Sequence, residues 1–284
     1  MDGIQPLLES CVHSSSINNW VDVKDSLRNV LAKESDFKSV VVGPFLQSLN
    51  EVLKSLAEKL GSDSEDSKVL QGCAAESFRC LRQACALNSD VQSGLSSCPD
   101  LLENTKLIIE KVHSLDSKSD SENVLKCSAQ FLGNTCASNT ENQKLIWDMF
   151  IQQLRLLVHH PDSKVCDYTC MLVHTCLSSL GRTDQSLLTD PLAQDVVLFC
   201  IQATAQQDVE WGLYVLEDML RNDLFLSTLY AKMGHKERVL LLEVMLAEMS
   251  EIPGGTEDGT SGQQDGRPDG GQSEESGDGG GGGG

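Results

Sequence analysis

The chain has 284 residues, of which 40% are hydrophobic and only 5% aromatic, and it carries a formal net charge of −20. This length can bury a sizeable core, and many small apolar side chains with few rings favour packed helices over a β-sandwich. A surface so negative repels phosphate groups, which argues against nucleic acids and anionic membrane surfaces as partners.

Cysteine usage and targeting patterns bear on the compartment. The eleven cysteines are Cys11, Cys73, Cys80, Cys85, Cys98, Cys127, Cys136, Cys166, Cys170, Cys176 and Cys200. None forms a CxxC pair, and most occur in apolar helical stretches, where a reduced thiol behaves as a small hydrophobic side chain. Neither a signal-peptide pattern nor the roughly 18 unbroken apolar residues of a membrane span occur, so we expect a cytosolic or nuclear protein.

Apolar residues recur at helical spacing along most of the chain. The first clear stripe extends from Phe45 to Leu60 and follows Pro44, which suits the first turn of a helix. Later stripes occupy residues 146–157, 192–203 and 239–249. Because the period-two alternation of strands is not evident, the sequence predicts an all-α fold.

An internal repeat relates three segments of the chain. Residues 80–86 match residues 131–137 at an offset of 51, and residues 171–176 continue the match at an offset of 40. Armadillo and HEAT arrays repeat with a period of about 40 to 47 residues. Such helices bury their apolar faces only against stacked neighbours, so we predict an armadillo-like superhelix, an α-solenoid of about five or six units.

The first two copies are each followed by a predicted helix start. Ser89 with Gln92, and Thr140 with Gln143, match a capping box, in which a hydroxyl side chain precedes a glutamine by three residues. We therefore expect one helix to end and another to begin at the same place in both copies.

Polar stretches mark the expected loops and the end of the repeat domain. Residues 61–68 and 114–122 are predicted loops, and residues 159–162 a turn between two helices. From residue 252 onward glycine and acidic residues dominate, and such a segment lacks the apolar surface that offsets the entropy lost on ordering. We expect an armadillo-like domain over residues 1–251 and a disordered Gly/acidic tail over residues 252–284.

Several motifs, in their order and spacing, resemble the ataxin-10 family. They are Phe78–Cys85 (FRCLRQAC), Gln130–Asn134 (QFLGN), Asn142–Gln143 with Trp147, His160–Asp162 (HPD) with Tyr168, and Glu237–Val239 with Leu241–Leu242. The resemblance covers residues 70–250 well and the first 60 residues more loosely. Family members continue into a C-terminal ataxin-10 domain, which we expect this chain to lack, together with functions of that domain such as self-association.

The resemblance also implies a biological setting. It implies a cytoplasmic and perinuclear scaffold, also present at the midbody and ciliary base, that acts in neuronal survival, neurite outgrowth through Ras–MAP kinase signalling, and cytokinesis. It further implies O-GlcNAc transferase and a G-protein β subunit as partners.

The sequence shows no constellation typical of an enzyme. Neither a phosphate-binding GxxxxGK[ST] loop nor a GxSxG nucleophile elbow occurs, so we predict no catalytic residue and no cofactor. Cys166, Cys170 and His174 are spaced four apart and could hold zinc with a fourth ligand from a neighbouring helix. Because these positions fall on a repeat helix that needs small side chains, we favour a structural role and predict no metal.

The repeat alignment instead suggests a surface for binding proteins. In an armadillo array the third helix of each unit lines a concave groove, and the polar positions on these helices are Arg79, Gln83, Lys126, Gln130, Asn134, Cys170 and His174. Such a ladder could hydrogen-bond an extended peptide, with Gln130 and Asn134 facing solvent in the free protein. The alternative is that these residues are the solvated stripe of ordinary amphipathic helices.

The predicted function is therefore a non-enzymatic protein–protein interaction scaffold. The alternative is an armadillo-type cargo or transport adaptor that binds extended peptides.

Overall fold

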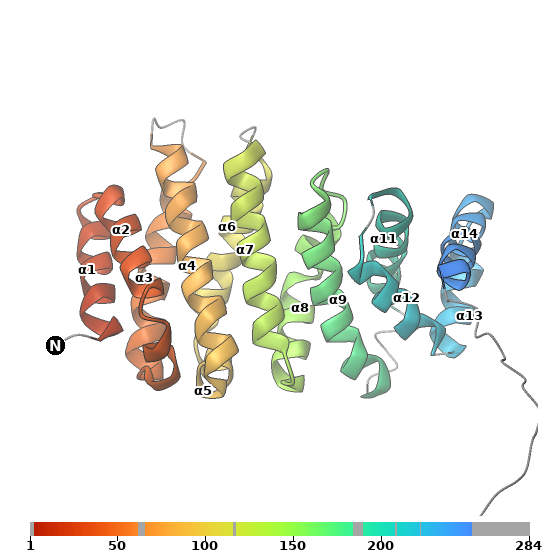
Figure 1. The fold of residues 1–284 in the computed structure, drawn as a ribbon, viewed down its shortest axis with the longest axis horizontal. Helices are drawn as coiled ribbons and strands as arrows, with labels where there is room; N and C mark the ends of the chain where they lie inside the picture. Colours follow the sequence, from red (N-terminus) through yellow and green to blue (C-terminus); the bar gives the residue numbers. More distant parts are fainter. Residues whose placement is uncertain are drawn as a thin grey trace, which may run out of the picture.

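A computed structural model describes residues 3–61, 66–115, 118–183, 190–207, 209–221 and 223–251. Throughout these ranges the regular structure is helical, which confirms the predicted all-α solenoid (Figure 1). None of the helices in these ranges is long and apolar enough to cross a membrane. The predicted tail, residues 252–284, lies outside the described residues.

The helices follow one another with short connections. The N-terminal elements are α1 (Ile4–Ser16), α2 (Trp20–Leu31), the 3-10 helix η1 (Glu34–Ser39), α3 (Val42–Lys59), α4 (Ser67–Leu87), α5 (Ser89–Gly94), η2 (Leu95–Ser97), α6 (Pro99–His113) and α7 (Lys118–Cys136). The C-terminal elements are α8 (Thr140–Leu157), α9 (Ser163–Thr183), α11 (Pro191–Gln207), α12 (Trp211–Leu220), α13 (Asp223–Lys232) and α14 (His235–Glu251).

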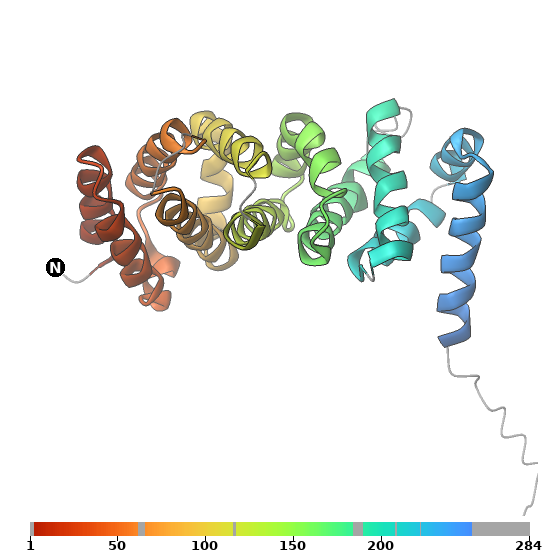
Figure 2. The same ribbon diagram turned by 90° about the horizontal axis from the view of Figure 1, so that it is seen from above.

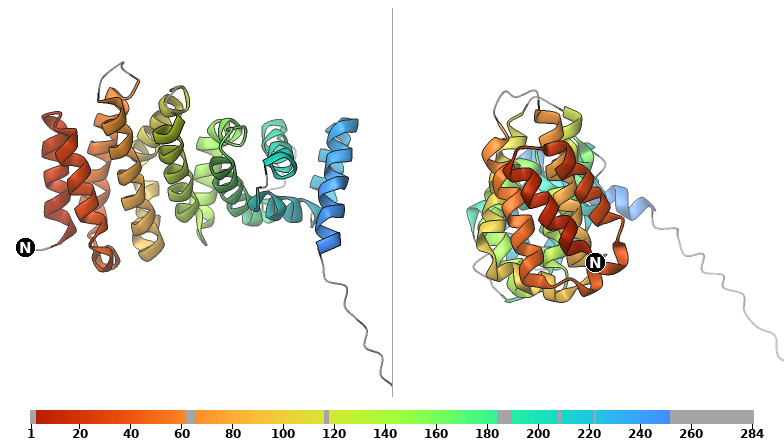
Figure 3. Two further views of the ribbon diagram at one scale, coloured as in Figure 1. Left: turned by 45° about the horizontal axis from the view of Figure 1, so that its top comes forward. Right: turned by 90° about the vertical axis from the view of Figure 1, so that its left-hand side faces the viewer.

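The long helices form two stacked rows. Row A consists of α1, α3, α6, α8, α11 and α14, and row B of α2, α4, α7, α9 and α12, each helix contacting the next one in its row. Figure 2 shows the two rows side by side at α3, α6 and α8 against α4, α7 and α9. Viewed along the long axis, most of the helices overlap within one compact outline (Figure 3).

A single hydrophobic core runs between the rows from Ile4 to Leu241. Within it the rings of Phe78 on α4 and Phe131 on α7 stack with their centroids 6.1 Å apart. Leu81 and Leu132, which occupy equivalent repeat positions, are both buried there. Each helix therefore depends on neighbours in its own row and in the opposite row for burial of its apolar face.

The helices that follow the first two repeat copies begin where the sequence predicted. The predicted capping residues, however, lie one position after the residues that cap these helices. The caps are Asn88 and Asn139, whose side chains accept the backbone N–H groups of Asp90 and Asn142. An asparagine one residue earlier satisfies the free N–H groups equally well, which leaves the expected Ser89 and Thr140 as the first helical residues.

The glutamines of the two predicted capping boxes have another role. Gln92 donates to the carbonyl of Asn134 (2.6 Å), and Gln143 donates to that of Cys136 (3.0 Å), so both tie one helix to the end of another.

The predicted loop at residues 114–122 is shorter than expected. α7 already begins at Lys118, and its first turn contains Asp120, an acid that interacts favourably with a helix N-terminus. Part of the predicted loop at residues 61–68 lies outside the described residues. The turn at residues 159–162 is present between α8 and α9, and the side chain of Asp162 accepts the N–H of Val165 at 2.9 Å.

Candidate protein-interaction surface

Row B carries all of the residues predicted to line a groove. Arg79 and Gln83 lie on α4, three others on α7, and Cys170 with His174 on α9. All except Cys170 are half-buried, whereas the Cys170 side chain is fully buried in the core. Six of the seven residues thus lie partly exposed on row B, and Cys170 does not reach the surface.

At the N-terminal end of row B, charged side chains connect three neighbouring helices. Glu76 on α4 is the central group, with a side chain only 10% exposed. Its carboxylate lies 3.4 Å from the Nε of Arg28 on α2 and 2.8 Å from a guanidinium nitrogen of Arg79. Arg79 also donates to the side-chain oxygen of Asn123 on α7 at 3.0 Å. Arg79 is therefore part of a network that holds α2, α4 and α7 together.

The middle of row B is linked through Arg82. The guanidinium of Arg82 on α4 donates to Oε1 of Gln130 at 2.5 Å, and its backbone carbonyl accepts Nδ2 of Asn134 at 3.1 Å. Gln83, one residue further along α4, donates to a carboxylate oxygen of Glu34 at 2.9 Å. Gln130 and Asn134, predicted to face solvent, are instead half-buried and bonded across the α4–α7 interface.

Toward the C-terminus the same kind of pairing continues. The ammonium of Lys126 on α7 lies 3.6 Å from a carboxylate oxygen of Asp162 at the start of α9. The Nδ1 of His174 on α9 lies 2.7 Å from Oδ2 of Asp218 on α12, so the imidazole donates and the carboxylate accepts. Each half-buried residue of the predicted ladder therefore has a partner on a neighbouring element.

These pairings determine what the ladder can do chemically. A half-buried hydrogen bond contributes about 0.5–1.5 kcal/mol net, and an extended peptide would have to replace such bonds rather than fill vacant ones. The polar ladder is thus in the first place a set of links between repeats. The repeat alignment located the positions, but their partners Glu76, Arg82 and Asp218 come from contacts that sequence spacing does not encode.

Sequence reasoning also missed an aromatic cluster at the C-terminal end of row B. Trp211 and Tyr214 on α12 lie beside His174 of α9, with ring centroids 5.0 to 5.7 Å apart. The Tyr214 side chain is 43% exposed, and Trp211 is half-buried. The spacing of Trp211 and Tyr214, three residues apart on one helix, was the available signal. The structure adds the neighbouring helix that brings the histidine to them.

The alternative zinc cluster is not assembled. The Cys166 thiol donates to the carbonyls of Val158 and His160, and His174 is engaged with Asp218. Across the described ranges, no three His, Cys, Asp or Glu side chains gather as they would around a metal ion.

The cysteines are free thiols, ten of them buried and Cys98 half-buried. Burial raises the pKa of Cys11 to about 11 and that of Cys166 to about 12, and the neighbouring Cys200 thiol together with burial raises the pKa of Cys170. A thiol that is both inaccessible and protonated at neutral pH is a poor nucleophile. These positions therefore belong to the core and not to a reactive site.

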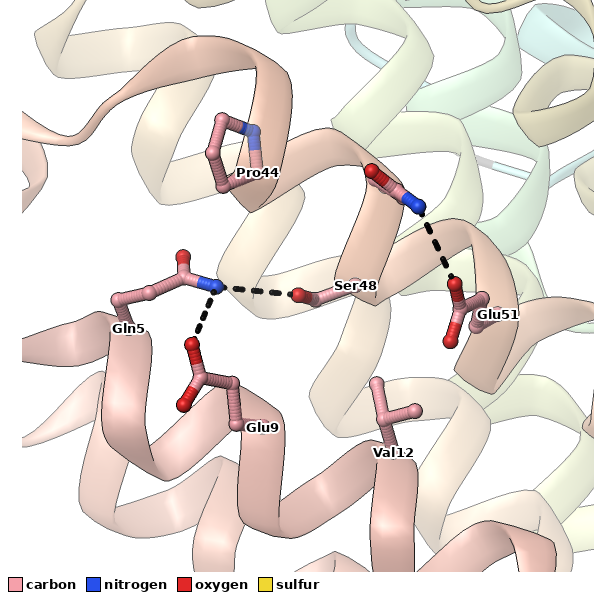
Figure 4. A pocket seen from close by; sticks show the side chains of 7 residues that line it. Gln5, Glu9, Val12, Pro44, Ser48 and Glu51 are labelled. Atoms are coloured by element: carbon pink, nitrogen blue, oxygen red, sulfur yellow. Dashed lines mark hydrogen bonds between the residues drawn. The ribbon is translucent and has the colours of Figure 1, made fainter.

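A small pocket opens between α1 and α3, away from row B (Figure 4). It has a volume of about 210 Å³ and is lined by Gln5, Glu9, Val12, Pro44, Gln47, Ser48 and Glu51. Gln5 donates to Glu9 and Ser48, and Gln47 donates to Glu51, so both carboxylates already accept hydrogen bonds (Figure 4). The pocket has no convergent set of unpaired polar groups that would indicate a ligand.

Two stacked rows of helices around one continuous core define the class of this protein, an armadillo-like α-solenoid. A solved structure of an engineered protein has the same fold, with a TM-score of 0.50 and 14% sequence identity over 87% of this chain and 98% of that chain. No protein-family model matches the sequence.

Curated relatives confirm the resemblance to the ataxin-10 family. Ataxin-10 of Xenopus tropicalis is 33% identical over 183 residues, which is 62% of this chain and 36% of that protein. Ataxin-10 of Bos taurus is 26% identical over 77% of this chain, and that of Homo sapiens 24% identical over 78%, in both cases covering 47% of the relative. The chain therefore matches less than half of the length of these relatives.

Proposed function

We propose that this chain is a non-enzymatic protein-interaction scaffold that binds partner proteins along row B. The observation that supports this most directly is the aromatic cluster of Trp211, Tyr214 and His174, which lies partly exposed on a stack of packed helices. Tyrosine and tryptophan are enriched among the residues that dominate binding energy at protein interfaces. The resemblance to ataxin-10 is consistent with such a role.

The contacts of the ladder favour a scaffold over a peptide-cargo adaptor. A peptide-binding ladder needs amide groups that are available to an incoming backbone. Here Gln130 and Asn134 are bonded to Arg82, and Gln83 is bonded to Glu34. We infer that partners are held by side-chain anchors at the aromatic cluster, while the ladder keeps the helices of row B in register.

The finer roles follow from the resemblance and are part of the proposal. They are neuronal survival, neurite outgrowth through Ras–MAP kinase signalling, and cytokinesis, in the perinuclear cytoplasm, at the midbody and at the ciliary base. The proposed partners are O-GlcNAc transferase and a G-protein β subunit.

Hydrogen–deuterium exchange with purified partners tests the proposal. The full chain is mixed with O-GlcNAc transferase or the G-protein β subunit, and amide exchange is compared with that of the free chain. We expect protection in α9 and α12 and unchanged exchange in α6 and α8 of row A. Protection restricted to row A, or no binding to either protein, would count against this assignment.

A further inference from the structure

We propose that the aromatic cluster of His174, Trp211 and Tyr214, with Asp218 beside it, is an anchor site for a lysine or arginine side chain of a partner protein. This inference rests on the proposed scaffold function and specifies the chemistry of the partner at that surface. The occupant is a basic side chain of a protein segment.

The rings form a compact and fixed group. The centroids of Trp211 and Tyr214 are 5.0 Å apart, and that of His174 lies 5.7 Å from Trp211 and 5.6 Å from Tyr214. The ring planes meet at 39° to 47°, so the three rings pack against one another at a tilt and do not stack flat. The faces of Trp and Tyr rings carry partial negative charge and attract a cation within about 6 Å of the ring centroid.

Carboxylates add to the attraction for a cation. Asp218 is 18% exposed and directs Oδ2 to His174, while its Oδ1 accepts no hydrogen bond from any residue that the structure describes. Glu210 precedes Trp211 and is exposed, and Glu217 pairs with Arg221 on the same helix. Asp167, which accepts the backbone N–H of Trp211, pairs with Lys164, so the acids on and next to α12 outnumber the bases by four to two. In a chain whose net charge is −20, a basic partner is therefore favoured both locally and at long range.

Elsewhere the chain supplies its own cations to aromatic rings. Arg238 lies 4.4 Å from the centroid of the Tyr230 ring, and Arg155 lies 5.8 Å from that of Phe199. Trp211 and Tyr214 have no Lys or Arg over their rings among the described residues, although indole is the best ring for binding a cation. Within the part of the chain that the structure describes, no cation of this chain therefore competes with one from another protein for these two rings.

Neighbouring contacts hold the site in place before any partner binds. The backbone N–H of Trp211 donates to Oδ1 of Asp167 on α9 at 3.0 Å. Gly212 packs so closely on α11 that a Cβ there would collide with Thr204 and approach the carbonyl of Cys200. Since α12 is fixed against both α9 and α11, little conformational entropy is lost at the site on binding.

Peptide titrations followed by NMR test the site. The probes are nine-residue Gly/Ser peptides with a single central Lys, Arg or uncharged norleucine, added to the 15N-labelled full chain. The three tryptophans give separate indole N–H signals, and the buried Trp20 and Trp147 serve as internal controls. We expect the Lys and Arg peptides to shift the Trp211 signal and to leave the signals of Trp20 and Trp147 unchanged. The norleucine peptide should bind at least tenfold more weakly, and it should therefore shift the Trp211 signal only at a much higher concentration.

Three variants sharpen the test. Tyr214→Ala and Asp218→Asn should each weaken Lys-peptide binding by about fivefold or more, which corresponds to roughly 1 kcal/mol. Tyr230→Ala removes a tyrosine that is similarly exposed, at 45% against 43%, and should leave binding unchanged. Melting temperatures of all variants establish that they are folded.

Equal affinity for the norleucine peptide, absence of any Trp211 shift with the cationic peptides, or equal losses in Tyr214→Ala and Tyr230→Ala would overturn the proposal. The scaffold function is tested separately with the protein partners. If a partner protects row B and Tyr214→Ala binds that partner like the unmodified chain, the cation site is wrong and the scaffold function stands.

Discussion

At the scale of single residues, Arg82 explains why two polar side chains of α7 contribute to folding. It donates to Gln130 through its guanidinium and accepts from Asn134 through its backbone carbonyl. Both bonds cross the interface between α4 and α7, the helices that also stack Phe78 on Phe131. The pair of amides therefore fixes the register of two repeats while apolar contacts supply most of the binding energy between them.

Replacing Gln130 and Asn134 together by alanine should lower the free energy of unfolding by about 1–3 kcal/mol, because two inter-helix hydrogen bonds are lost. Urea denaturation measures this value. Leu132→Ala, a truncation of a side chain that is 1% exposed, sets the scale at about 2–5 kcal/mol. Gln152→Ala, at an exposed position on α8, is the matched control and should change stability little. A double variant as stable as the unmodified chain would show that these bonds are not structural.

At the scale of elements, the start of α9 depends on a neutral histidine. The backbone N–H of Asp162 donates to Nδ1 of the half-buried His160 at 3.1 Å, so this nitrogen must carry no proton. Burial and the nearby charge of His113 lower the pKa of His160 below 6.5, with Lys126 acting in the same direction and Asp162 and Glu122 opposing it. The folded chain therefore binds this proton less readily than the unfolded chain does.

This pKa shift makes stability depend on pH with a definite sign. The contribution of His160 is fully present above its unfolded pKa of 6.5 and is lost as the pH falls through the lower folded pKa. As the pH is lowered from about 7.5 to about 5.5, the urea midpoint of the unmodified chain should fall. The urea midpoint of His160→Gln should fall less steeply, because the glutamine side-chain oxygen can accept the same hydrogen bond and does not titrate. If the urea midpoint depended on pH equally in the unmodified chain and in His160→Gln, His160 would not be the cause of the pH dependence.

Repeat spacing and apolar periodicity predicted the helices well, because both reflect local geometry. The offsets of 51 and 40 placed α4, α7 and α9 in equivalent positions, and the stripe from Phe45 to Leu60 corresponds to α3. What spacing could not give is the partner of each polar residue. The bonds from Arg82 to Gln130 and from His174 to Asp218 depend on rotamers and on helix offsets that only the packed structure defines.

At the scale of the whole molecule, the boundary of the repeat domain is a proposal with a direct test. Truncation after Glu251 removes a segment dominated by glycine and acidic residues, which has little apolar surface to bury. The truncated chain should keep the melting temperature of the full chain, as measured by circular dichroism. A large drop in melting temperature would show that residues 252–284 contribute to the fold.

Two exposed positions allow the two rows to be compared in one experiment. The photo-reactive residue p-benzoylphenylalanine is placed either at Arg221, the C-cap of α12 in row B, or at Leu107 on α6 of row A, so that the aromatic cluster itself stays intact. Melting temperatures show that both chains remain folded. Each chain is then irradiated with purified O-GlcNAc transferase or the G-protein β subunit.

Photo-crosslinking from these two positions tests most directly whether partner proteins bind along row B. We predict a cross-linked partner from position 221 and none from position 107. Cross-links from position 107 alone, or equal yields from both positions, would contradict it.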